Sequence, residues 1–99
     1  MMGNYRLTPE ADNDLVTIWL YTFENWGIDQ ANSYLEKLEN QFLALSQQHN
    51  IGRPVDQIRQ GYRCFHYNRH LIFCRSQMKN QIEIVRILHD RMAVDQHFD

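Results

Sequence analysis

Three consecutive residues near the C-terminus, His89, Asp90 and Arg91, have side chains suited to proton transfer. A histidine oriented by a carboxylate beside an arginine fits phosphoryl chemistry, because imidazole exchanges protons near neutral pH and guanidinium stabilises negative charge. The three residues follow the apolar stretch Ile82 to Leu88, which is typical of a β-strand. Adjacent residues on a strand point to opposite faces, so we expect His89 and Asp90 not to cooperate directly. We therefore favour a binding or structural role for His89.

Arginines alternate with aromatic residues in the second half of the chain. These residues are Arg59, Tyr62, Arg63, Phe65, Tyr67, Arg69, Arg75, Arg86, His89 and Arg91. Guanidinium groups and rings can grip a phosphate backbone and stack on bases, and they can equally clamp an acidic protein segment. For the aromatic residues we favour packing in the core. For Arg86 we favour binding, because it interrupts an apolar strand and an unpaired buried guanidinium is costly.

Metal and cofactor chemistry has little support in the sequence. The five histidines do not show the Cys/His spacing of a structural zinc site, and both cysteines fall inside predicted strands. The sequence contains no glycine-rich phosphate loop, no Gly-x-Ser-x-Gly motif and no paired carboxylates at a strand end. We expect no metal, no cofactor and no catalytic nucleophile.

A small antiparallel sheet is predicted to position these side chains. Ile82 to Leu88 is apolar at all but two positions, as in a strand with both faces covered. Gly61 to Tyr67 and Leu71 to Arg75 are predicted to join it in a three-stranded meander. Tyr5 to Leu7 suits an edge strand.

The turn of the first hairpin decides where the two cysteines point. A two-residue turn at Asn68 and Arg69 pairs Cys64 with Phe73 and places Cys74 on the opposite face. A three-residue turn sets Cys64 directly opposite Cys74. The sequence leaves both registers open. In either case we expect free, buried thiols, because the N-terminus lacks the features of an export signal.

Two amphipathic helices are predicted to cover one face of the sheet. Thr8 and Pro9 form a helix start, and Gly27 ends that helix. Asp29 is predicted to cap a second helix after a short connection, which makes the two helices antiparallel. Their apolar stripes are Ala11, Leu15, Ile18, Trp19, Thr22 and Trp26, and then Ala31, Tyr34, Leu35, Leu38, Phe42 and Leu45.

Composition indicates one globular domain over residues 1–99, with 43% apolar residues and no apolar run long enough to cross a membrane. We predict a cytoplasmic location. Residues 1–52 hold two basic and seven acidic side chains, a net charge of −5, whereas residues 53–91 hold eight basic and three acidic ones, a net charge of +5. An acidic helical half and an arginine-rich sheet half favour an acidic partner for the basic side.

The predicted order of a short strand, a helical hairpin and a three-stranded antiparallel meander resembles the α+β fold of the ParE/RelE toxin superfamily. Several motifs are similar to those of the ParE branch. They are Leu7-Thr8-Pro9-Glu10-Ala11-Asp12, Asp14-Leu15, Ile18-Trp19, Trp26-Gly27, Ala31, Tyr34-Leu35, Gly52-Arg53-Pro54, Ile58-Arg59, Gly61-Tyr62-Arg63, His70, Ile72-Phe73, Ile87-Leu88-His89 and Arg91-Met92. Each motif alone has low specificity, and the ordered set covers nearly the whole chain.

The resemblance implies a toxin of a type II toxin–antitoxin system, a class linked to plasmid stabilisation, that a ParD-like antitoxin neutralises. ParE toxins are associated with inhibition of DNA gyrase and a block of replication, whereas RelE relatives cut messenger RNA on the ribosome. RelE-type enzymes use lysine, arginine and a late tyrosine or histidine. Here Lys79 is the only lysine in the sheet half, and no tyrosine follows the last strand. We expect a non-enzymatic gyrase inhibitor, and a ribosome-dependent endoribonuclease is the alternative.

The two expected partners are assigned to two groups of residues. Target contacts are predicted for Arg63, Arg75, Arg86, His89, Arg91 and Met92. Antitoxin contacts are predicted for Trp19, Trp26, Tyr34, Arg59 and Tyr62. An acidic, amphipathic antitoxin segment is expected to cover the apolar rim of the hairpin and the arginine face. We do not expect direct, sequence-specific nucleic-acid binding, because the chain is acidic overall.

Overall fold

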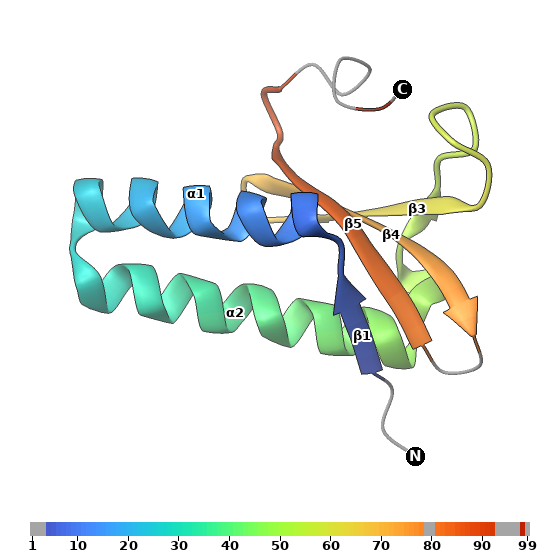
Figure 1. Ribbon diagram of the computed structural model, residues 1–99, viewed down its shortest axis with the longest axis horizontal. Helices are drawn as coiled ribbons and strands as arrows, with labels where there is room; N and C mark the ends of the chain where they lie inside the picture. Colours follow the sequence, from blue (N-terminus) through green and yellow to red (C-terminus); the bar gives the residue numbers. More distant parts are fainter. Residues whose placement is uncertain (1–3, 79–80, 93–97, 99) are drawn as a thin grey trace.

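The computed structural model describes residues 4–78, 81–92 and 98 of the 99-residue chain. It is an α+β fold in which a helical hairpin packs on a twisted sheet, as the sequence predicts (Figure 1). The elements are β1 (Asn4–Leu7), α1 (Pro9–Trp26), α2 (Ile28–Gln47), the 3-10 helix η1 (His49–Ile51), β2 (Arg53–Pro54), β3 (Tyr62–Tyr67), β4 (His70–Met78) and β5 (Gln81–His89).

The described strands form a five-stranded sheet in the order β1-β5-β4-β3-β2. The predicted meander of β3, β4 and β5 is confirmed, and β4 lies in its middle. The outer neighbour of β5 is β1, which pairs parallel to it. The short strand β2 adds an edge beyond β3 that the sequence did not predict. Proline is tolerated there because an edge strand leaves one row of N–H groups unpaired.

The β3–β4 hairpin adopts the two-residue turn. Tyr67 pairs with His70 and Cys64 pairs with Phe73, so the two cysteines point to opposite faces. Asn68 takes a φ of 56°, a left-handed conformation that asparagine tolerates better than most residues. Both cysteines are free and buried, as predicted.

The two helices meet at a single glycine. Thr8 caps α1 as predicted, and its hydroxyl accepts a hydrogen bond from the Ala11 N–H at 3.0 Å. Gly27 has a φ of 93°, so one residue reverses the chain, ending α1 and preceding α2. The prediction that Asp29 caps α2 is wrong, because α2 already begins at Ile28 and Asp29 lies inside its first turn.

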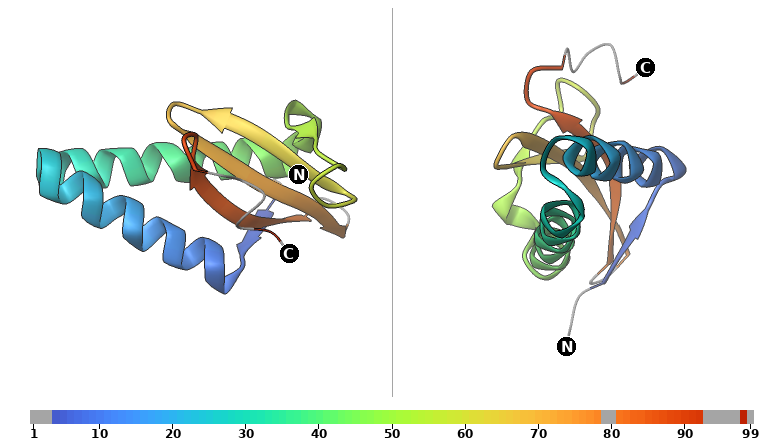
Figure 2. Two further views of the ribbon diagram at one scale, coloured as in Figure 1. Left: turned by 90° about the horizontal axis from the view of Figure 1, so that it is seen from above. Right: turned by 90° about the vertical axis from the view of Figure 1, so that its left-hand side faces the viewer.

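The main core lies between the hairpin and one face of the sheet. It contains Ala11 and Leu15 from α1, Leu38, Phe42 and Leu45 from α2, and Ile72, Cys74, Ile82, Ile84 and Ile87 from the sheet. Most of the predicted stripes are buried or half-buried there. Trp26 is the exception at 64% exposure, because the closed end of the hairpin extends past the sheet (Figure 2).

The opposite face of the sheet carries a second, smaller core. Val55, Cys64, Phe73 and Leu88 are buried there, and Phe98 packs edge-on against Phe73 with ring centroids 4.8 Å apart. The two predicted alternatives for the segment after Met92, a helical turn or a frayed tail, concern residues 93–97 and 99, which lie outside the described residues. None of the helices in the described part of the chain is long and apolar enough to cross a bilayer.

Candidate functional site: an apolar groove with a cationic rim

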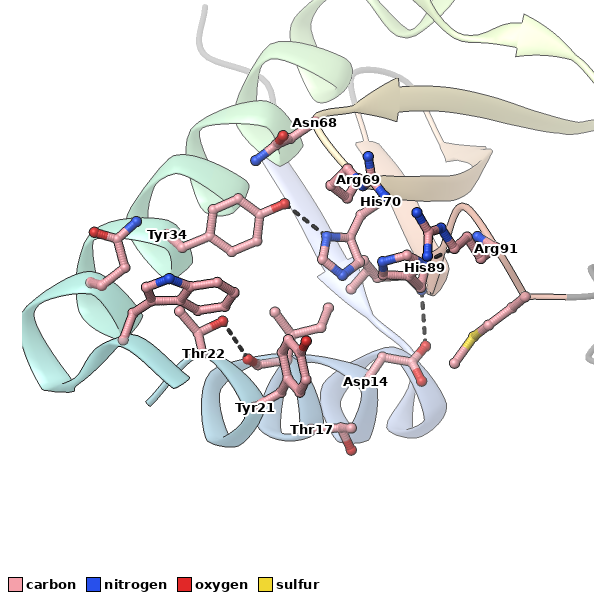
Figure 3. A pocket seen from close by; sticks show the side chains of 15 residues that line it. Asp14, Thr17, Tyr21, Thr22, Tyr34, Asn68, Arg69, His70, His89 and Arg91 are labelled. Carbon is pink, nitrogen blue, oxygen red and sulfur yellow. Dashed lines mark hydrogen bonds between the residues drawn. The ribbon is translucent and has the colours of Figure 1, made fainter. Parts of the chain in front are cut away.

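An open groove of about 850 Å³ lies between the helical hairpin and the end of the sheet that carries the β3–β4 turn. Figure 3 shows its side chains converging from four parts of the chain. They are Asp14, Thr17, Ile18, Tyr21, Thr22 and Trp26 of α1, Gln30 and Tyr34 of α2, Asn68, Arg69 and His70 at the turn, and Ile87, His89, Arg91 and Met92 at and after the end of β5.

The surface of the groove is mainly apolar. Ile18, Thr22 and Ile87 contribute half-buried or buried side chains, and Thr22 returns its hydroxyl hydrogen to the Ile18 carbonyl at 2.8 Å. Tyr21 and Trp26 contact one another edge-on with centroids 6.0 Å apart, and both are more than half exposed. Exposed aromatic rings around an apolar hollow are typical of a protein-binding surface.

Two arginine side chains line one side of the groove. Arg69 lies in the β3–β4 turn and Arg91 in the turn after β5. The two turns are tied together because the Asp90 N–H donates to the Arg69 carbonyl at 2.9 Å. Both arginine side chains are exposed, so they give the rim a positive charge without filling the groove.

Tyr34 and His70 form a hydrogen-bonded pair inside the groove, with the Tyr34 hydroxyl 2.7 Å from the His70 Nδ1. Burial raises the pKa of Tyr34 to about 12. Burial, aided by the nearby His89, lowers the pKa of His70 to about 4. The phenol is therefore protonated and the imidazole neutral at pH 7, so we assign the phenol as donor and Nδ1 as acceptor.

Acid is expected to destabilise the fold through His70. Its pKa is about 4 in the folded chain and about 6.5 when unfolded, so the unfolded chain gains a proton first and stability falls as the pH drops from about 6.5 towards 4. Between pH 7 and pH 5 we expect a loss of about 1 kcal/mol from this group, because solvent screens part of the effect. Urea unfolding of His70→Gln at both pH values should lack this loss. His66→Gln, at an exposed histidine, should retain it.

His89 and Asp90 do meet, contrary to the sequence prediction. The His89 Nδ1 lies 3.3 Å from Asp90 Oδ1, and the His66 Nε2 lies 3.4 Å from Asp90 Oδ2. The prediction failed because β5 ends at His89 and Asp90 already belongs to the following turn. The same Nδ1 accepts a hydrogen bond from the Arg91 N–H at 3.1 Å, which assigns the proton of the neutral ring to Nε2.

Arg86 has a partner inside the molecule. Its Nε and Nη2 donate to the two carboxylate oxygens of Asp14 at 2.8 and 3.0 Å. Only 20% of the Arg86 side chain and 15% of the Asp14 side chain are exposed. These hydrogen bonds raise the pKa of Arg86, which is charged at any physiological pH. A contact between Arg86 and the target, as predicted from the sequence, therefore competes with the ion pair that Arg86 forms with Asp14.

The remaining predicted contact residues are dispersed. Arg63 donates to the Gly52 carbonyl and fastens the segment before β2 to β3. Arg75 pairs with Glu83 at 2.7 Å across β4 and β5. Tyr62 packs against the second core, on the opposite face of the sheet, and Arg59 lies exposed in the loop before it. Trp19 donates from its indole N–H to Asn32 at 2.9 Å.

The groove therefore joins members of both predicted groups. Trp26 and Tyr34 come from the antitoxin group, and His89, Arg91 and Met92 come from the target group. Sequence reasoning did not assign Asp14, Tyr21, Asn68 and His70 to a site, and it named Arg69 only among the arginines that could bind a partner. One available signal was Arg86 itself, since a charged residue in an apolar strand requires a carboxylate from another element. Among the residues that the structure describes, no group of three potential ligands is placed to hold a metal ion.

Comparison with known proteins is consistent across sequence and fold. A family model described as the ParE toxin of the type II toxin-antitoxin system, parDE, matches residues 5–94. The chain is 39% identical over 97 residues to Toxin ParE1 of Mycobacterium tuberculosis, covering 98% of this chain and 99% of that protein. It is 33% identical over 96 residues to Toxin ParE1 of Caulobacter vibrioides, covering 97% and 98% of the two chains.

The fold has a solved counterpart. A chain of the structure titled "Chromosomal ParDE TA system from P. aeruginosa" superposes with a TM-score of 0.73 over 89% of this chain and 96% of that one, at 22% identity. The superposition supports the fold, and the sequence matches support the family. The resemblance first noted in the motifs is confirmed, and the chain belongs to the ParE toxin family of type II toxin–antitoxin systems.

Proposed function

We propose that this toxin inhibits DNA gyrase and that an acidic, amphipathic segment of a ParD-like antitoxin neutralises it by lying in the groove. The observation that carries the antitoxin part is the groove's combination of an apolar floor, exposed aromatic rings and an arginine rim. An amphipathic segment buries its apolar side on such a floor and places its carboxylates against the rim.

The apolar surface left open supports a permanent partner. Tyr21, Trp26 and Met92 are exposed at 59%, 64% and 45% and border the same groove. Covering one large side chain of this kind stabilises a complex by roughly 1.5–3 kcal/mol, and aromatic residues are frequent anchors in interfaces. A toxin stored with its antitoxin has this kind of surface.

The contacts of three arginines support a binding function rather than a catalytic one. Arg63, Arg75 and Arg86 have their guanidinium groups engaged by Gly52, Glu83 and Asp14. These arginines therefore stabilise the sheet and its contact with α1. The gyrase target is supported by the membership of the ParE family and by its resemblance in motifs to the ParE branch.

A supercoiling assay with purified toxin tests whether gyrase is the target. With gyrase and relaxed plasmid, toxin is expected to suppress supercoiling and to increase the amount of cleaved DNA trapped by detergent. Prior addition of an equimolar amount of the cognate antitoxin is expected to restore supercoiling. Full supercoiling activity at a large stoichiometric excess of toxin would exclude gyrase as the target.

A second function has one specific observation in its favour. The Asp90 carboxylate lies between His66 and His89, next to two exposed arginines, and an imidazole N–H such as that of His89 Nε2 can act as a general acid on the leaving oxygen of an RNA phosphodiester. This arrangement supports the ribosome-dependent endoribonuclease alternative. It predicts cleaved transcripts in a translating extract that receives the toxin, and their loss with His89→Gln. Intact transcripts with the unmodified toxin would exclude it.

A further inference from the structure

A second exposed apolar surface runs along the outer side of α1. Val16, Leu20 and Phe23 are spaced by four and three residues, so they form one stripe, and they are exposed at 55%, 48% and 43%. Trp19 stacks on Phe23 with ring centroids 5.3 Å apart and an interplanar angle of 6°. The Trp19 indole is itself held by Asn32 of α2. These contacts restrain the Phe23 ring at one end of the stripe.

The charges beside this stripe are acidic. Helix α1 contains Glu10, Asp12, Asp14 and Glu24 and no basic residue. Asp12 and Glu24 are exposed and flank the stripe on the helical wheel. On α2, Glu36 follows Asn32 by one turn and lies on the same side of that helix. An acidic partner segment is repelled by this border, whereas a basic one is attracted.

The stripe and the groove lie on different sides of the hairpin. Along α1, Tyr21 and Asp14 face the groove, while Val16 and Leu20 do not line it. The two surfaces also differ in the sign of the charge around them, with Arg69 and Arg91 at the groove. One acidic antitoxin segment does not suit both surfaces.

We propose that the outer stripe of α1 is a second docking surface, which receives a basic, amphipathic segment of the toxin's target. The inference rests on the proposed function as a toxin, and it assigns antitoxin and target to separate surfaces of the hairpin. Charge complementarity selects the occupant, because apolar contact alone does not distinguish a basic segment from an acidic one.

Two substitutions at one position test both the site and the sign of the charge. Leu20→Lys and Leu20→Glu remove the same apolar contact, but only the lysine repels a basic partner. The toxin concentration that half-inhibits supercoiling by purified gyrase is expected to rise about 30-fold for Leu20→Lys and about 5-fold for Leu20→Glu. Gln57→Lys, which adds the same charge on an exposed loop, should leave it unchanged. The affinity of all three variants for the cognate antitoxin should stay within about twofold of the unmodified toxin.

Each other result overturns the inference. Equal potency of Leu20→Lys and the unmodified toxin would remove the stripe from the target surface. A larger loss with Glu than with Lys would give the partner the opposite charge. Weakened antitoxin binding would make the stripe part of the antitoxin surface. A dimer in light scattering that Leu20→Lys dissociates would make the occupant a second copy of the chain.

The inference and the gyrase proposal fail in different ways. If the unmodified toxin stops cell growth but leaves gyrase active, gyrase is excluded as the target. The same variants are then ranked by the induction level that they need for growth arrest, and this ranking tests the inference about the stripe. Loss of arrest with Leu20→Lys supports it, and unchanged arrest overturns it. A chain that neither inhibits gyrase nor stops growth overturns both.

Discussion

Replacement of Asp14 by Ala is expected to lower the free energy of unfolding by about 3 kcal/mol. The Asp14 carboxylate accepts three hydrogen bonds, two from the Arg86 guanidinium and one from the Ile87 N–H at 2.9 Å. The substitution leaves a largely buried guanidinium and a strand N–H without this partner. Loss of one member of a buried ion pair costs more than the pair contributes, because the remaining charge stays desolvated.

The position of Asp14 explains why this carboxylate matters. Strand β1 pairs with β5 only as far as Leu7 and Ile84, so the outer edge of β5 continues without a neighbouring strand. The start of α1 takes over that edge. The Thr8 N–H donates to the Ile84 carbonyl at 3.0 Å, the Thr8 hydroxyl donates to the Val85 carbonyl at 2.7 Å, and Asp14 accepts from Ile87. A β-bulge at Val85 accompanies this change of partner.

Chemical denaturation of the unmodified protein and four variants measures the effect. Asp14→Ala and Arg86→Ala are each expected to lose about 3 kcal/mol, and the double variant little more than either single one, since the two groups act as a unit. Asp12→Ala is the control, because Asp12 is exposed on the same helix and should change stability by less than about 0.5 kcal/mol. Additive losses in the double variant would contradict the coupling. Loss of toxicity by Arg86→Ala at unchanged stability would instead support its predicted contact with the target.

The hydrophobic pattern was sufficient to predict the fold class and the order of elements. Both faces of the strand at Ile82–Leu88 are covered, and the apolar stripes of α1 and α2 cover one of them. The pattern did not predict that Gly27 alone connects the helices, because the sequence also allows Asp29 as a cap. Nor did it decide the hairpin register, which depends on whether Asn68 adopts a left-handed conformation.

The candidate site was less accessible to sequence reasoning, because its members come from four separate segments. Sequence indicated that Arg86 needs a partner, but Asp14 lies 72 positions away and only the packing of α1 on β5 brings the two together. Trp26 was predicted both as a member of the apolar stripe over the sheet and as an antitoxin contact, and it is 64% exposed, since helical periodicity does not report where the sheet ends. His89 and Asp90 were separated by the rule of alternation along strands, which stops applying at the last residue of β5.

Charge reversal at the groove is expected to weaken antitoxin binding strongly. In the double variant Arg69→Glu and Arg91→Glu, four units of charge change on the rim, and the Kd for the cognate ParD-like antitoxin should rise about 100-fold. Both side chains are exposed, so we expect stability to change by less than about 0.5 kcal/mol. Calorimetric titration at two salt concentrations should show a smaller salt dependence for the variant than for the unmodified toxin.

Arg59→Glu provides the decisive comparison for the groove. Sequence assigned Arg59 and Tyr62 to the antitoxin, but Tyr62 packs against the second core, on the opposite face of the sheet, and Arg59 lies exposed in the loop before it. If the antitoxin segment occupies the groove, Arg59→Glu should change the Kd by less than about threefold, while the Arg69 and Arg91 variants lose binding. The opposite ranking would place the segment across the far face of the sheet. In that case Tyr21 and Trp26 should remain accessible in the complex, and hydrogen exchange at α1 should be unchanged by the antitoxin.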